Sequence, residues 1–155
     1  MLRKAYSRNP FDGEGAYRYG GRWSSSGTRL SYASEYQSLA MLEYFVHLDK
    51  DDPPDDLVLA VAEVPKDLGR EQIAVSKLPP DWRETAAPAA LRRIGDEFAK
   101  RRKYCLLLLP SVLAPSEHNC LINPEHPDYK RVTVRTATPL NYDRRMFGTK
   151  HRRRD

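Results

Sequence analysis

Two β-strands stand out in the pattern of apolar and polar positions. Residues 28–33 alternate, with Leu30 and Tyr32 on one face, as in a strand that is buried on one side. The apolar run at residues 104–109, which Pro110 stops, is typical of a strand buried on both faces. Further strands are predicted at residues 2–6, 57–64, 73–75 and 129–138.

The first predicted helix covers residues 35–48. Ser34 stands at the N-cap position, and Gln37 three residues later completes a capping box. Apolar residues occur almost all round this helix, which indicates that it is buried. The acidic, proline-containing segment 49–56 ends it.

A second helix is predicted from Pro88 to about residue 102, with Leu91, Ile94 and Phe98 facing inward. Loops are expected at residues 12–15, 20–27 and 119–124. Because no repeat or linker divides the pattern, the sequence predicts a single α+β domain. We expect a central, mostly antiparallel sheet flanked by two main helices.

The composition narrows the class of protein. Of the 155 residues, 40% are hydrophobic and 30% are charged, as in a globular domain with its own core. No apolar stretch approaches the roughly 20 residues that cross a bilayer, and the N-terminus lacks the apolar segment of a secretory signal. Cys105 and Cys120 are too few for a disulfide framework. We therefore expect a cytoplasmic protein without a membrane partner.

The net charge of +5 is unevenly distributed. Residues 130–155 contain nine Lys and Arg against two Asp, a balance of +7, so residues 1–129 sum to −2. We expect a domain of residues 1–148 followed by a basic tail of residues 149–155. A non-catalytic, basic nucleic-acid-binding module is an alternative, although such a module would carry its cations over the folded body.

Glu43 lies in the middle of the first predicted helix and has Leu39, Ala40, Val46 and His47 one turn away. A carboxylate among apolar neighbours needs a partner. Two interpretations follow. Either His47 supports a glutamate at the edge of the helix, or Glu43 is a catalytic or ligand-binding carboxylate at a cleft.

Arg22 and Tyr32 are candidates for ligand contacts. Arg22 follows two glycines, which let a ligand approach the main chain, and its guanidinium can bind a phosphate through two hydrogen bonds. The alternative is a tight turn with a surface arginine. Tyr32 can stack on a planar base, or it belongs to the core. The glycine spacing fits neither a dinucleotide-binding nor a phosphate-loop motif.

Ser111 and Asn119 are further polar candidates after the predicted buried strand. No nucleophile elbow surrounds Ser111, so we do not expect it to act as a nucleophile. The four histidines and two cysteines show no metal-ligand spacing, so no metal site is expected.

Six sequence blocks occur in this order between about residue 6 and residue 148: GEGAYRYGGRW, TRLSYASEYQSLAMLEYFVHL, LPPDW, IGDEF, LLLLPSVLAPSEHNCLINPEHPDYK and DRRMFG. In these blocks the chain resembles the RES domain family of bacterial toxins. The resemblance implies a fold similar to that of ADP-ribosyltransferase toxins. It also implies an enzyme that cleaves the nicotinamide–ribose bond of NAD⁺, as a glycohydrolase or a phosphorylase. The alternative is ADP-ribosyl transfer to a cellular protein.

The resemblance also implies roles for five residues. Glu43 would stabilise the ribosyl cation and hold its hydroxyls, and Arg22 would hold the pyrophosphate. Tyr32 would stack on or wall in the nicotinamide, while Ser111 and Asn119 would orient the substrate or the attacking group. NAD⁺ would be a substrate, and no cofactor is expected.

The partner that the resemblance implies is an antitoxin of a type II toxin–antitoxin pair. It would be a helical, Xre-like protein that blocks the active site and binds operator DNA. The toxin would then meet DNA only through this partner, and a toxin homodimer is one arrangement of the complex.

Overall fold

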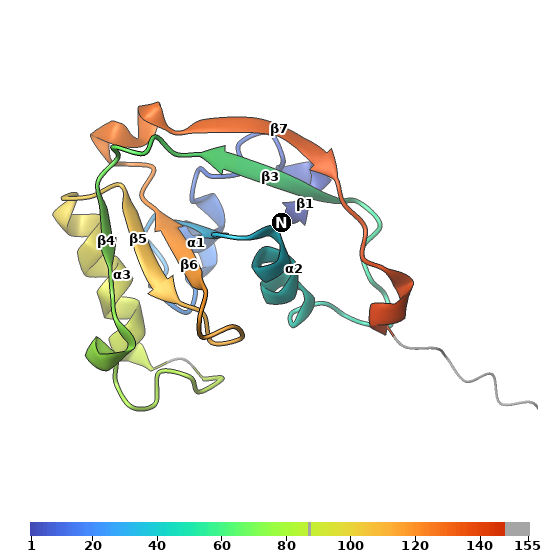
Figure 1. Cartoon of the computed structure of the whole chain (residues 1–155), viewed down its shortest axis with the longest axis horizontal. Coiled ribbons are helices and arrows are strands. Elements are labelled where there is room, and N and C mark those ends of the chain that lie inside the picture. Colours follow the sequence, from blue (N-terminus) through green and yellow to red (C-terminus); the bar gives the residue numbers. More distant parts are fainter. Residues whose placement is uncertain (87, 148–155) are drawn as a thin grey trace, which may run out of the picture.

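Two sheets form the framework of the fold, which a computed structural model describes for residues 1–86 and 88–147 (Figure 1). In this part of the chain the smaller sheet has the strand order β1-β3-β7 and the larger sheet β2-β6-β5-β4. The strands are β1 (Leu2–Arg3), β2 (Ser31–Ser34), β3 (Leu57–Glu63), β4 (Arg70–Gln72), β5 (Leu106–Pro110), β6 (His118–Ile122) and β7 (Thr133–Pro139). The helices are α1 (Glu14–Tyr19), α2 (Gln37–Phe45) and α3 (Ala89–Arg101), with 3-10 helices η1 (Lys4–Tyr6), η2 (Val75–Lys77), η3 (Pro127–Arg131) and η4 (Arg144–Phe147).

The strand pairs are antiparallel except for β4 and β5, which run parallel. A parallel pair needs a crossover connection, and the chain between β4 and β5 supplies it through α3. Figure 1 shows α3 on one face of the larger sheet. The predicted α+β class and the mostly antiparallel pairing are confirmed, but two sheets replace the single central sheet.

The first hydrophobic core lies between α3 and the larger sheet. It consists of buried Trp23, Leu30, Trp82, Leu91, Phe98, Leu107, Leu109 and Leu121. Gly95 in α3 allows a close approach here, because a Cβ on this residue would lie 1.8 Å from the carbonyl oxygen of Trp23. The helix therefore packs directly on the turn that contains Arg22 and Trp23.

The second core lies on the other face of the larger sheet, toward the smaller sheet, and includes Phe11, Leu68, Leu106, Ile122 and Val132. Both cysteines lie on this side. Cys105 is 1% exposed, and burial raises the pKa of its thiol to about 11. Cys120 packs against the same core, and burial raises its pKa to about 12. Neither forms a disulfide bond.

Three predicted elements are confirmed closely. The strand expected at residues 104–109 is β5, which is buried throughout, and the second helix is α3, with Leu91 and Phe98 buried. The strand expected at residues 57–64 is β3. Within the described residues no helix has both the length and the apolar character needed to cross a membrane.

The prediction of a loop at residues 119–124 was wrong, because residues 119–122 belong to β6. This strand pairs with both β2 and β5, so it lies inside the sheet. Its two faces each mix a polar or weakly polar residue with an aliphatic one, Asn119 with Leu121 and Cys120 with Ile122, which hides the alternation that marks a strand. Helix α1 also lies partly in a segment that was expected to be a loop.

The predicted capping box of the first helix was wrong. Tyr36, not Ser34, is the N-cap of α2, and it makes no side-chain hydrogen bond to the helix. The helix is also less buried than its apolar sequence indicates. Leu39 is buried, but Leu42 and Val46 are 37% and 48% exposed.

We predict that Gly95→Ala destabilises the protein although alanine favours helices. The added methyl group would overlap the main chain of Trp23, and such overpacking costs about 1–3 kcal/mol. Gly15→Ala is the matched control, since no atom lies within 4 Å of the position of its Cβ and the helical residue should gain up to about 1 kcal/mol. Urea unfolding measures both free energies, and equal effects would contradict the close packing.

Candidate active site

A cavity of about 860 Å³ lies beside α2, β2 and β3, bordered on another side by β5 and β6. Its volume falls within the range of roughly 300–1,000 Å³ that is usual for small-molecule sites. Part of its wall consists of residues of the second core, among them Phe11, Leu106 and Ile122. The polar residues that line it include Tyr32, Ser34, Glu43 and Asn119.

Two hydrogen-bond donors converge on one oxygen of Glu43. Ser111 Oγ donates to Glu43 Oε1 at 2.8 Å, and Asn119 Nδ2 donates to the same oxygen at 2.6 Å. Hydrogen bonds to a charged acceptor are the stronger kind, so the pair fixes the carboxylate. Oε2 of Glu43 takes part in no hydrogen bond with the described residues, which leaves that oxygen for a ligand.

Ser111 is a fixed donor to Glu43. The residue is fully buried just after β5, and its Oγ accepts hydrogen bonds from the main-chain N–H groups of Leu113 and Ala114 at 3.0 and 3.1 Å. A hydroxyl has one proton, and with both acceptor positions used that proton points to Glu43. The tight turn after β5 thus sets the direction of the bond.

Asn119 is oriented by Ser34. The pairing of β2 with β6 places these two residues opposite each other, and Ser34 Oγ donates to Asn119 Oδ1 at 2.7 Å. Because the amide oxygen accepts from Ser34, the amide NH₂ faces Glu43. Ser34 is thus a member of the site that the sequence interpretation missed, since a serine two or three residues before a helix has the usual pattern of a cap.

Tyr32 connects the cavity to the turn that carries Arg22. Its side chain lines the cavity and is 41% exposed, while its hydroxyl accepts from the N–H of Trp23 at 3.0 Å and bonds to Ser24 Oγ at 2.9 Å. Burial raises the pKa of this hydroxyl, so it stays protonated at neutral pH. A Cβ on Gly21 would lie 2.6 Å from the Tyr32 hydroxyl, so a larger residue there would displace the tyrosine ring.

The guanidinium of Arg22 binds main-chain oxygens. Nη1 donates to the carbonyl of Trp82 and Nη2 to that of Glu84, each at 2.9 Å. Three of its five N–H groups remain available. Within the described residues its charge is not paired with any carboxylate.

The structure brings Glu43, Ser111 and Asn119 together by direct hydrogen bonds and places Tyr32 on the same cavity. Arg22 and Ser111 do not line that cavity, and Arg22 forms no ion pair with Glu43. The alternative in which His47 supports Glu43 is not what the contacts show, since the partners come from β6 and the turn after β5. Among the described residues, no three His, Cys, Asp or Glu side chains cluster as metal ligands.

Comparison with protein families matches residues 2–143 to the RES domain. A protein of Sphingobium sp. (strain YBL2) named Prs ADP-ribosylating toxin is 37% identical over 146 residues, which are 93% of this chain and 91% of the relative. Proteins named Toxin Res from Pseudomonas putida and Yersinia enterocolitica are 35% and 32% identical; the alignments cover 87% and 92% of this chain and 91% and 92% of theirs. The chain therefore belongs to the RES domain family.

Proposed function

We propose that this chain is a toxin that cleaves the bond between nicotinamide and ribose in NAD⁺. The observation that carries the proposal is the carboxylate of Glu43, which lies on a cavity of ligand size with one oxygen held by two donors and the other oxygen free. The relatives named as toxins support the physiological part of the proposal.

The reaction breaks the bond from ribose C1 to nicotinamide N1. The bonding electrons leave with nicotinamide, which becomes neutral, and the ribose carbon gains oxocarbenium character. A carboxylate that is already fixed beside this carbon stabilises the developing positive charge without reorganising. In the proposed complex Oε2 of Glu43 also accepts a hydrogen bond from a ribose hydroxyl, while Ser111 and Asn119 hold Oε1.

Arg22 and Tyr32 contribute to substrate binding in this proposal. The ring of Tyr32 on the cavity wall stacks on or borders the nicotinamide. Arg22 uses its remaining N–H groups on the pyrophosphate, a match that its unpaired charge favours. This role requires the dinucleotide to extend from the cavity toward residues 82–84, whose carbonyls Arg22 also binds.

The acceptor of the ribosyl group distinguishes three reactions. Water would give ADP-ribose and a proton, phosphate would give a phosphorylated product, and a protein side chain would give ADP-ribosylated protein. The protein acceptor is the second candidate, because the relative with 37% identity is named an ADP-ribosylating toxin. With any of the three acceptors the bond between nicotinamide and ribose breaks, and Glu43 has the same role.

The proposed partner is a helical, Xre-like antitoxin that covers the site and links the toxin to DNA. The exposed apolar side chains on and beside α2 favour such a contact, because Tyr36, Leu42 and Val46 are 58%, 37% and 48% exposed.

We predict that Glu43→Gln lowers NAD⁺ turnover at least roughly 100-fold, because it removes the charge and keeps the size of the side chain. Purified protein is mixed with NAD⁺, with and without phosphate, and the products are identified by mass. The control is Glu97→Gln, which changes an exposed glutamate of α3 and should turn over NAD⁺ like the wild type. Equal turnover in the Glu43 variant would reject the assignment.

A second variant tests the contacts of Glu43. Asn119→Asp replaces a donor at 2.6 Å by a second carboxylate, and two like charges at this distance cost about 1–3 kcal/mol of stability. We expect this loss at pH 7 and a smaller loss near pH 4, where one carboxyl binds a proton. Asn119→Ala should show no such change with pH. Urea unfolding at both values makes the comparison, and a pH-independent loss in both variants would contradict the arrangement.

Expression in bacteria tests the toxin proposal. Wild-type protein should stop growth and lower cellular NAD⁺, whereas Glu43→Gln at the same soluble level should allow growth. Normal growth with abundant, folded wild-type protein would count against a toxin.

A further inference from the structure

Helix α2, which carries Glu43, depends on contacts from elsewhere in the chain. It has nine residues, of which only Leu39 is buried, and no side chain caps its N-terminus. An isolated helix of this length is not stable in water. Its position is therefore set by the residues that pack against it.

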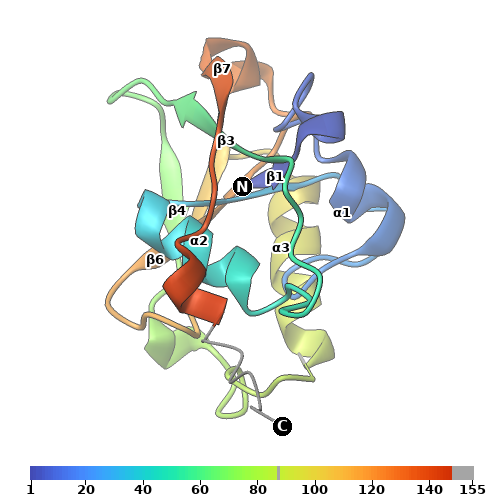
Figure 2. The ribbon, with the colours of Figure 1, turned by 90° about the vertical axis from the view of Figure 1, so that its right-hand side faces the viewer.

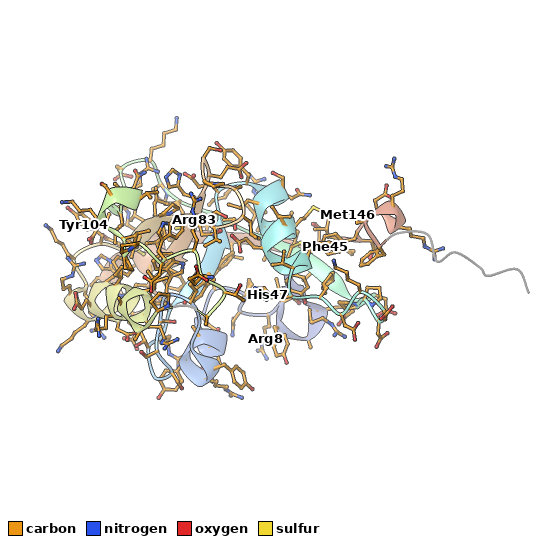
Figure 3. All side chains as sticks on the ribbon, turned by 90° about the horizontal axis from the view of Figure 1, so that it is seen from below. Arg8, Phe45, His47, Arg83, Tyr104 and Met146 are labelled. Carbon is orange, nitrogen blue, oxygen red and sulfur yellow. The ribbon has the colours of Figure 1, made fainter. Side chains whose placement is uncertain are left out.

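The C-terminal strap, defined here as residues 140–147, packs against the last turns of α2. Phe45 lies 5.5 Å from the ring of Tyr142 and 5.6 Å from the ring of Phe147, and Tyr142 meets Phe147 edge-on at 6.0 Å. The Tyr142 hydroxyl also donates to the main-chain carbonyl of Met41 at 2.5 Å. Figure 2 shows the chain descending from β7 to η4 beside α2. Figure 3 labels Phe45 of α2 and Met146 of η4, which lie on the same side of the molecule.

The strap and the catalytic hydrogen bonds hold opposite faces of α2. Met41 and Phe45 each lie two residues from Glu43, which is about 200° around a helix with 3.6 residues per turn. Ser111 and Asn119 hold the carboxylate on one face, and Tyr142 holds the other face. Without the strap, α2 could shift away from Ser111 and Asn119, and the hydrogen bonds that these residues donate to Glu43 would lengthen.

The strap is itself anchored. It follows β7, which pairs with β3, and the N–H of Leu140 donates to the carbonyl of Leu57 at 2.9 Å. Burial raises the pKa of Tyr142 to about 12, so its hydroxyl remains a donor at neutral pH.

We propose that the C-terminal strap positions Glu43 for catalysis. Tyr142 is the positioning residue, because its hydroxyl binds the main chain of α2 on the face opposite Glu43. The part of this inference that concerns the rate of NAD⁺ cleavage rests on the proposed function. A displacement of about 1 Å at a reacting group can cost roughly 100-fold in rate, so a single hydrogen bond at the back of the helix has a measurable effect.

Tyr142→Phe removes the hydroxyl and keeps the aromatic cluster. The matched control is Tyr129→Phe, since the Tyr129 hydroxyl also donates to a main-chain carbonyl, that of Phe11 at 2.9 Å, without contacting α2. Both variants should lower the urea midpoint by similar amounts. We expect kcat for NAD⁺ to fall roughly 5- to 50-fold in Tyr142→Phe with KM unchanged, and to stay within about twofold in Tyr129→Phe. Equal kcat values for the two variants would overturn the proposal.

Hydrogen exchange separates this proposal from the proposed function. If wild-type protein does not consume NAD⁺, the proposed function fails, and the strap is judged by the amide exchange of residues 40–46. Faster exchange there in Tyr142→Phe than in Tyr129→Phe supports the strap, and equal exchange overturns it.

Discussion

The site depends on one oxygen atom, Oε1 of Glu43, on which two donors from neighbouring strands converge. Asn119 lies in β6, and Ser111 follows β5 directly, so the pairing of these strands sets both positions. The register pairs Leu109 with Asn119. A slip of one residue would turn Asn119 to the other face of the sheet and remove its bond to Glu43.

The first core supports the other half of the site. Trp23 is buried under α3, where Gly95 lets the helix touch the main chain, and the Tyr32 hydroxyl binds the N–H of the same tryptophan. The neighbouring Arg22 then reaches the carbonyls of residues 82 and 84. Packing in the core thereby fixes a turn rich in glycine and serine, a composition that would otherwise leave the chain many conformations.

The sequence predicts those parts of the fold whose signal is local. Strand β5 is a continuous apolar run and α3 has a clear inward face, and both are found where expected. Strand β6 was missed because each of its faces mixes a polar or weakly polar residue with an aliphatic one, which hides the alternation. The exposure of α2 was missed because the apolar composition of a helix does not show which of its side chains the rest of the fold covers.

The candidate site was only partly predictable, because the sequence signals are local and the contacts of the site are not. Family motifs point to Arg22, Tyr32, Glu43, Ser111 and Asn119, but the bonds among them join residues that lie far apart in the chain. Ser34 and Asn119 are 85 positions apart, and only the β2–β6 pairing brings them together. The main-chain partners of Arg22, the carbonyls of Trp82 and Glu84, lie about 60 positions away and have no signal in the sequence.

The two cysteines have a practical consequence. Burial holds the pKa of Cys105 and Cys120 near 11 and 12, so almost no thiolate is present at physiological pH. Since the thiolate is the form that reacts with alkylating reagents, the native chain should resist labelling. A cysteine introduced at an exposed position would then be the preferred point of attachment for a fluorophore or spin label, without removal of the natural thiols.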